Sequence, residues 1–318
     1  MTMKYACKRV LMLLVTMIIV SLLCFVAFDM ISGDPATAML GTTATPESVE
    51  ALREELGLNR PLLVRYADWL LGFFSGDLGV SYSYRTPVSE LISSQTMVTL
   101  CLSLLSFVLI TAVSIPFGLS ASRHSGGLAD GIWTTGIQLL MAIPPFFIGV
   151  LLTWAFSILL GFFVHGSFPG LQEDFRGSLH YMLFAAIAIA IPRIAMTVRM
   201  LRSTIQGEMY KDYVRTAISR GNDRSRVLRR HVLKNALVPV VTFLAQTMAE
   251  IVAASVVVEQ VFSIPGLGRL LVASISNRDY PVVQAIVVIL AFWVVLAGTI
   301  ADIINQRIDP RLRLGGGK

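Results

Sequence analysis

Cysteine and charge are both scarce in this sequence of 318 residues, and each scarcity excludes a class of protein. Charged residues make up only 14% of the chain, whereas soluble domains carry about 25%. With 55% hydrophobic residues, the chain has too little polar surface to cover a water-soluble globule. The three cysteines are odd in number and lie in or beside apolar runs, so they predict neither a disulfide framework nor a metal site: Cys7, Cys24 and Cys101.

Motifs for catalysis and nucleotide binding are absent as well. No G-x-x-x-x-G-K-[ST] loop occurs, so the sequence has no motif for binding ATP itself. No H-E-x-x-H motif or nucleophile elbow occurs either, and the four histidines are scattered along the sequence. We therefore expect a chain that is not an enzyme and binds no cofactor or metal itself. An intramembrane enzyme is the remote alternative, and it would need ionisable residues clustered at one depth.

Long apolar runs are what the sequence has in abundance. A bilayer core of about 30 Å needs about 20 mostly apolar residues per helix. The first run is too long for the core of a signal peptide, so we interpret it as a retained span. The third contains Pro144 and Pro145, which predict a kink. The expected fold class is an all-α integral membrane protein with six transmembrane helices, at about 9–28, 97–121, 132–161, 180–201, 236–258 and 282–304.

The distribution of Lys and Arg orients these spans. With the N-terminus inside, the cytoplasmic segments carry 18 Lys and Arg residues and the outer segments carry 7. Because basic residues favour the cytoplasmic side, we expect a multi-pass protein of the cell (inner or cytoplasmic) membrane with both termini in the cytoplasm. The chain then divides into an N-terminal span, an external subdomain, a core transmembrane domain that includes a cytoplasmic loop at 202–235, and a cytoplasmic tail: 1–28, 29–96, 97–305 and 306–318.

The external segment 29–96 shows signs of folding. Thr45 is a candidate N-cap with Pro46 at the first helical position, and Gly57 would end the helix. Further on, "YADWLLGFFSGDLG" places aromatic residues at helical spacing. We interpret this stretch as part of a small subdomain resting on the membrane interface, where aromatic residues are common. An aromatic platform for a ligand is the alternative.

A dense basic block interrupts the apolar sequence between Arg199 and Lys234, with ten basic residues against three acidic ones. Asp212 is predicted to cap a short helix that ends at Gly221, a residue suited to positive φ. Asn222 is predicted to cap a second helix. The second helix would carry apolar residues and His231 on one side and basic residues, among them Arg226, on the other.

Three interpretations of this block compete. Nucleic-acid binding is disfavoured because it needs base-reading side chains, usually on a soluble module. A lipid-headgroup patch explains Arg199 and Arg202 but not the helix–Gly–helix pattern. A loop that docks a partner explains both the charge and the pattern.

The sequence also resembles a known family at this point. "RTAISRG" followed by "NDRSRVLRRHVLKNALVPVV" is similar to the cytoplasmic "EAA" loop of ABC importer permeases, and most similar to the B-type subunits of the dipeptide, oligopeptide and nickel branch. The resemblance extends over nearly the whole chain, through "GDPATAMLG" near the start, "VVVEQVFSIPGLGRLLVASISNRDYPVVQ" and "DIINQRIDPRLR".

The resemblance implies specific roles in this sequence. The first three positions of the family's loop fall on Arg215, Thr216 and Ala217, and its glycine on Gly221. Arg215 and Thr216 replace the acidic and small residues of the general motif, and its late proline falls on Lys234. As a coupling helix, the loop would insert into a groove of a separate ATPase. We assign to this coupling loop Arg215, Thr216, Ala217, Gly221, Asn222, Arg226 and His231.

The resemblance further implies a full transporter around this chain. Its partners would be a second homologous permease, two ATPase subunits that use ATP, and an extracytoplasmic substrate-binding protein, all within membrane lipid. The cargo would be di- or oligopeptides, with nickel or a metal–metallophore complex as the alternative. A single carboxylate in a span makes no nickel site.

Two ionisable residues at membrane depth are further candidates, because such groups are costly in hydrocarbon. Arg193 lies close to the basic side and could extend its side chain to the interface, or it could line the translocation path. Glu250 lies nearer mid-span, where it could pack against a polar neighbour or line the path.

Overall fold

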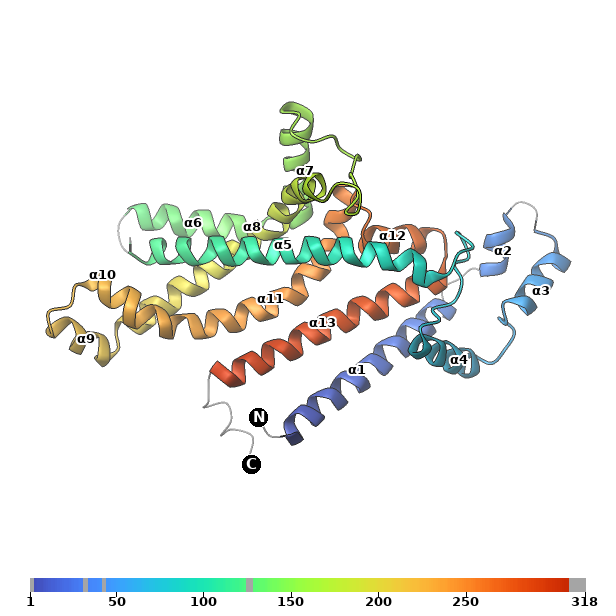
Figure 1. The fold of residues 1–318 in the computed structure, drawn as a ribbon, viewed down its shortest axis with the longest axis horizontal. Helices are drawn as coiled ribbons and strands as arrows, with labels where there is room; N and C mark the ends of the chain where they lie inside the picture. The colour runs from blue at the N-terminus through green and yellow to red at the C-terminus, as the bar shows by residue number, and fades with distance from the viewer. Residues whose placement is uncertain (1–2, 31–33, 42–43, 124–127, 309–318) are drawn as a thin grey trace. The chain divides into compact units, whose positions relative to one another are not determined.

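The computed structural model describes residues 3–30, 34–41, 44–123 and 128–308. Within these ranges all regular elements are helices, with one isolated bridge between Val80 and Pro87 (Figure 1). The expected all-α class is therefore confirmed. The chain forms two compact units, one from residues 1–100 and 264–295 (unit 1) and one from residues 101–263 and 296–318 (unit 2).

In the part of the chain that the structure describes, five helical segments are long and apolar enough to cross a membrane, and a sixth is counted if one bent pair forms a single span. The five are Val10–Phe28 within α1 (Met3–Met30), α5 (Val88–Arg123), α8 (Phe175–Met209), Arg224–Val261, which ends in α11 (Leu233–Val261), and Tyr280–Ile304 within α13 (Tyr280–Ile308).

The predicted third span is broken more sharply than a kink. It consists of α6 (Leu128–Ala142) followed by α7 (Pro145–Leu152) and the π-helix η2 (Thr153–Leu159). The two parts are bent by 95°. Pro144 is extended, with φ −64° and ψ 143°, and Pro145 opens the next helix. Because neither proline has an N–H, the hydrogen-bond ladder of α6 cannot continue through them.

The described part of segment 29–96, which is predicted to be external, contains α2 (Pro35–Leu40), α3 (Pro46–Glu55) and α4 (Leu62–Ser75). The helix predicted from Thr45 is confirmed as α3. The Thr45 side chain accepts from the backbone N–H of Ser48, whose own side chain accepts from the N–H of Thr45. This reciprocal pair is a capping box, which fixes where the helix begins.

Part of the aromatic face of α4 packs onto α1. The hydroxyl oxygens of Tyr66 and Ser21 lie 2.9 Å apart. The Tyr66 ring meets Phe25 edge-on at 5.5 Å between centroids. Phe74, in contrast, is 71% exposed. The aromatic stripe therefore holds α4 against the first span and leaves its outer edge uncovered.

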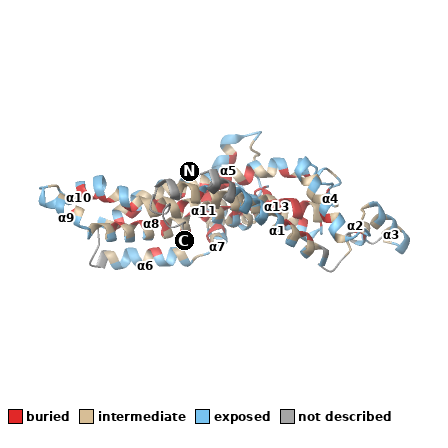
Figure 2. Ribbon diagram, turned by 90° about the horizontal axis from the view of Figure 1, so that it is seen from below, coloured by how far each residue is buried: buried red, intermediate tan, exposed pale blue. Residues whose placement is uncertain are grey.

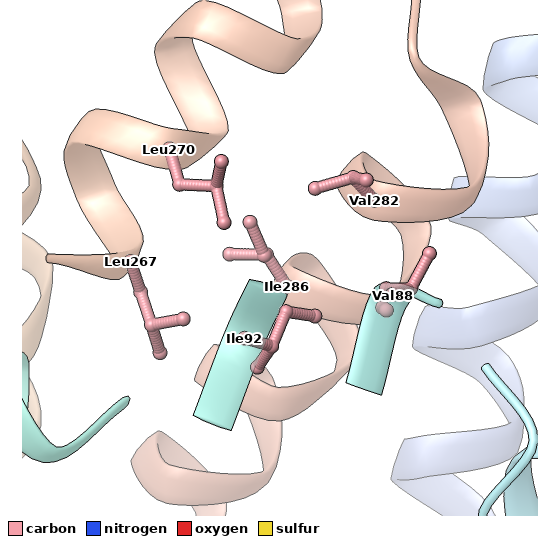
Figure 3. Close-up of a cluster of buried hydrophobic side chains, with 7 residues drawn as sticks. Val88, Ile92, Leu267, Leu270, Val282 and Ile286 are labelled. Atoms are coloured by element: carbon pink, nitrogen blue, oxygen red, sulfur yellow. The ribbon is translucent and has the colours of Figure 1, made fainter. Parts of the chain in front are cut away.

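The core of unit 1 contains residues from both stretches of sequence that form the unit. Val88 and Ile92 at the start of α5 pack against α12 (Leu267–Ser276) and the first turns of α13, as Figure 3 shows. The backbone N–H of Leu267 donates to Thr99 Oγ1 at 2.8 Å.

A buried carboxylate holds the loop between α4 and α5. Asp279 has no exposed surface and lies just before α13. One carboxylate oxygen accepts from the Tyr82 backbone N–H at 3.0 Å, and the other accepts from the Ser83 N–H at 3.2 Å and from the Ser81 hydroxyl. These bonds satisfy a buried charge and connect segments almost 200 residues apart in sequence.

We expect Asp279→Ala to release this loop. Removing the acceptor of three hydrogen bonds should cost about 3 kcal/mol, because the loop's donors are left unpaired. Limited proteolysis of the membrane protein should then cut between Val80 and Thr86 far faster than in the parent. The matched control is Asp77→Ala in the same loop, since Asp77 is exposed and its carboxylate accepts the Gly79 N–H at 2.9 Å. Equal cleavage of both variants would contradict the role of Asp279.

Unit 2 is built around α8 and α11, along which Figure 2 shows buried residues. Alanines that are at most 1% exposed lie on more than one side of α8 and permit close helix approach: Ala185, Ala186, Ala188 and Ala190. α7 approaches through Gly149, where an added Cβ would lie 3.1 Å from Phe262 and 3.2 Å from Val261. α6 packs against α8 through Ile137, Ala195 and Val198.

Candidate functional site

The basic block forms a compact helical hairpin between α8 and α11. It contains α9 (Asp212–Ser219), α10 (Arg224–Val227) and the π-helix η3 (Leu228–Val232). Gly221 joins the two arms with φ +82°, a left-handed value that glycine adopts without strain. The helix–Gly–helix pattern is confirmed. Figure 1 shows α9 and α10 together at the common end of α8 and α11.

Two capping predictions were wrong by one residue. Asp212 is the first residue of α9, and the preceding Lys211 occupies the cap position without a side-chain bond. Asp223, not Asn222, caps α10 by accepting from the Ser225 N–H at 3.0 Å. The Asn222 side chain instead donates to the Ala217 carbonyl at 3.0 Å. The reversal at Gly221 turns Asn222 back over the end of α9, where the Ala217 carbonyl also accepts the Asn222 backbone N–H at 3.4 Å.

α9 is anchored to both neighbouring long helices. Val214 is the buried residue of α9, with 1% of its surface exposed. The Tyr213 hydroxyl donates to Glu208 of α8 at 2.7 Å and also interacts with Asn235 of α11. Burial raises the pKa of Tyr213, and the charge of Glu208 raises it further, against the opposing effect of Asn235. The phenol therefore stays protonated and keeps donating to Glu208 at neutral pH.

The outer surface of the hairpin is uncovered in this chain. The Arg215 side chain is 76% exposed, and Ile218 presents 43% of its surface. Ala217 is half-buried beneath them. Of the residues assigned to the loop, those with exposed side chains are Arg215, Thr216, Arg226 and His231. An apolar residue surrounded by basic ones is suited to a protein partner with an acidic rim.

His231 lies on the opposite side from the one predicted. Val227, Leu228 and Val232 are buried as expected, but His231 is exposed with the basic residues. His231 lies within the π-helix η3, which has more residues per turn than an α-helix. Its side chain therefore points in a different direction from the one that α-helical spacing predicts. No signal in the sequence marks this turn.

Arg193 and Glu250 are brought together across α8 and α11. The Arg193 guanidinium forms a salt bridge with the Glu250 carboxylate. The Arg193 side chain is 22% exposed and that of Glu250 48%. Pairing offsets the cost of two charges at membrane depth, and the exposed part of Glu250 leaves it accessible to a neighbouring chain or a solute.

The hairpin and this ion pair lie on the same two helices. α8 carries both Arg193 and Glu208, which are about 22 Å apart at 1.5 Å per residue. α11 carries both Asn235 and Glu250. The Tyr213 contacts therefore connect α9 to both helices that hold the pair.

Unit 2 contains a further ion pair that the sequence does not predict. Arg202 of α8, which lipid headgroups alone would have explained, forms a salt bridge with Asp130 of α6 and donates to Thr134 at 3.0 Å. The partners are about 70 residues apart in sequence, so no local pattern indicates the pair. Among the described residues, no three His, Cys, Asp or Glu side chains gather as metal ligands would.

Comparison with known proteins assigns the chain to a family. Residues 114–314 match the binding-protein-dependent transport system inner membrane component, and residues 2–104 match the N-terminal part of such membrane components.

Similar curated proteins are related over almost their full length. The oligopeptide transport system permease protein AppB of Bacillus subtilis (strain 168) is 38% identical over 312 residues, which cover 97% of this chain and 98% of AppB. A putative peptide transport system permease protein of Brucella abortus (strain 2308) is 37% identical over 310 residues, or 96% and 98% of the two chains.

The glutathione transport system permease protein GsiC of Escherichia coli O6:H1 (strain CFT073) is 33% identical over 310 residues, 98% of this chain and 99% of GsiC. Both family matches and these relatives agree with the helical, membrane-spanning architecture. The chain belongs to the family of binding-protein-dependent transport system inner membrane components, the multi-pass permease subunits of ABC importers.

Proposed function

We propose that this chain is the pore-forming permease subunit of an ATP-driven importer for di- and oligopeptides. The observation that carries the proposal is the near full-length match to permeases named for peptide, oligopeptide and glutathione transport. Glutathione is itself a short peptide, so these names share one chemical class. They favour peptides over nickel or a metallophore complex as the cargo.

The proposed transporter contains other chains. Two ATPase subunits bind and hydrolyse ATP, a second homologous permease completes the pore, and an extracytoplasmic binding protein delivers the peptide. The exposed hairpin surface at Arg215 and Ile218, anchored through Val214 and Tyr213, supports docking of an ATPase there. The excess of Lys and Arg on one side supports a cytoplasmic hairpin and cytoplasmic termini in the cell membrane.

In the proposed mechanism, closure of the ATPase pair on ATP displaces α9. Because α9 is bound to α8 and α11, both helices move with it, and the pore changes from inward-open to outward-open. The two states differ in how the ATPases contact the hairpin, which supplies the differential interaction that coupling needs. Arg193 and Glu250 would line the path that opens.

Affinity isolation of the tagged chain from its own membranes tests the assembly. We expect a related permease and two Walker-motif ATPases to accompany it in stoichiometric amounts. Recovery of this chain alone after mild crosslinking would contradict the proposed assembly. Uptake of a labelled dipeptide and of radioactive nickel by cells with and without the gene then tests the cargo, and we expect only peptide uptake to fall.

A further inference from the structure

Two contacts fix how α8 and α11 run past each other. The first is the salt bridge between Arg193 and Glu250. The second is Tyr213, which bonds Glu208 of α8 and interacts with Asn235 of α11. On each helix the two contacts are fifteen residues apart, or about 22 Å, so the helices keep one antiparallel register between them.

A cavity of about 440 Å³ lies between these contacts, on the surface of both helices. Met200 of α8 and Phe243 of α11 line it, and each is seven residues, about 10 Å, from the salt bridge. Met196 also lines it, and its sulfur accepts a weak hydrogen bond from Arg193 Nη1 at 3.6 Å. A volume of this size accommodates a small ligand. The cavity therefore begins beside the salt bridge and extends from there towards the hairpin.

The cavity contains a cation without a carboxylate partner. Arg199 lines it and is exposed, and in the described part of the chain Arg199 forms no salt bridge. Arg193 and Arg202 of the same helix, in contrast, are both paired. Ser203 lies one turn beyond Arg199 and is exposed as well. A carboxylate in the cavity could therefore pair with Arg199 without displacing a side chain of this protein.

The walls around this cation are apolar and adaptable. They consist mainly of Met196, Met200 and Phe243. Methionine is unbranched and polarizable, so it fits against groups of different shapes. Such walls suit a transporter whose solutes share a charged end but differ in their side chains.

The distance from Arg199 to the salt bridge matches the length of a short peptide. Arg193 and Arg199 are six residues apart on α8, or about 9 Å. Three residues of extended peptide span about 10 Å. Glu250 is 48% exposed, so part of its carboxylate can meet an ammonium group at the other end.

We propose that this cavity is a site for a short peptide in transit, with the peptide's carboxylate on Arg199 and its amino end towards Glu250. The site rests on the proposed function, because it assumes that peptides pass along α8 and α11. A lipid acyl chain would use the methionine wall but would gain nothing from Arg199 or Glu250. A zwitterionic peptide uses all three features of the cavity.

Cysteine protection in the assembled transporter tests the site. Met200→Cys is introduced into the full-length chain after its three cysteines are replaced by alanine. The chain is assembled in nanodiscs with its permease and ATPase partners, without nucleotide and without the binding protein, whose own selectivity is thereby removed. We expect a small water-soluble methanethiosulfonate to label Met200→Cys. Trialanine should slow this labelling at a roughly tenfold lower concentration than trialaninamide, the effect of one charge-assisted hydrogen bond.

Three variants serve as controls. Arg199→Gln should reduce the difference between the two peptides to about onefold, because the cation that pairs with the carboxylate is gone. Arg176→Gln makes the same charge change at an exposed position near the other end of α8 and should leave the difference unchanged. Ser276→Cys, at an exposed position in unit 1, should label at the same rate with either peptide.

Several results would overturn the proposal. If Met200→Cys cannot be labelled in the assembled transporter, another subunit or lipid covers the cavity. Equal protection by trialanine and its amide, or by inorganic phosphate, would exclude recognition of a peptide carboxylate. An equal loss of the difference in both arginine variants would assign it to general charge.

Uptake of labelled trialanine by cells with and without the gene separates this site from the proposed function. Uptake that does not depend on the gene would contradict the proposed function and the site together. Uptake that depends on the gene, without selective protection of Met200→Cys, would contradict the site alone.

Discussion

Replacing Gly221 by proline is expected to abolish solute uptake while leaving the protein in the membrane at its normal level. Proline fixes φ near −65°, whereas Gly221 has φ +82°, and it removes the N–H that donates to the Ile218 carbonyl at 2.9 Å. Strain and the lost bond together cost about 3 kcal/mol, so the population with a correctly formed hairpin falls roughly a hundredfold. Uptake should fall with it, since the hairpin is the proposed contact with the ATPase.

Gly221→Asn is the matched control. An added Cβ at this position meets no atom within 4 Å, and asparagine tolerates positive φ better than other non-glycine residues. Uptake should therefore stay within about twofold of the parent, a few tenths of a kcal/mol. Transport assays in cells, normalised to membrane-extracted protein, measure both variants. Normal uptake by well-expressed Gly221→Pro would exclude the hairpin as the coupling element.

Neutralising Glu250 is expected to have the second largest effect. Glu250→Gln leaves the Arg193 guanidinium at membrane depth without its carboxylate. Fully buried pairs lose about 3–5 kcal/mol in this way, and we expect about 1–2 kcal/mol here because Glu250 is 48% exposed. Uptake should fall roughly tenfold, and the thermal midpoint of the purified protein should fall as well.

The double variant Arg193→Gln/Glu250→Gln distinguishes packing from a role in the path. Removing both charges eliminates the unpaired cation, so the thermal midpoint should recover. If the pair lines the translocation path, as we propose, uptake stays low in this variant. Recovery of both quantities would mean that the pair serves only helix packing between α8 and α11.

The elements that the sequence predicts well depend on local rules. The α3 capping box involves residues three apart, and the φ of Gly221 reflects the backbone freedom of one residue. The apolar spans follow from the thickness of the bilayer. Each of these features can be recognised without knowing any other part of the fold.

The features that the sequence could not predict depend on packing between distant segments. Pro144 and Pro145 indicate a break, but its 95° angle accompanies the approach of Gly149 to Val261 and Phe262. The direction of His231 depends on the π-turn, and the salt bridges of Arg193 and Arg202 join residues on different helices. Single charges in apolar helices indicated that a partner exists but not which residue it is.

The Asp279 contact has a consequence for how the protein is made. Unit 1 combines residues 1–100 with residues 264–295, so its first part leaves the ribosome long before the second. Until Asp279 arrives, the Ser81 hydroxyl and the Tyr82 N–H lack their carboxylate, and Val88 lacks the α13 residues that cover it. In a nascent or truncated chain, the part of unit 1 formed by residues 1–100 therefore cannot close. Its exposed apolar surface would mark an incomplete permease for proteolysis before assembly.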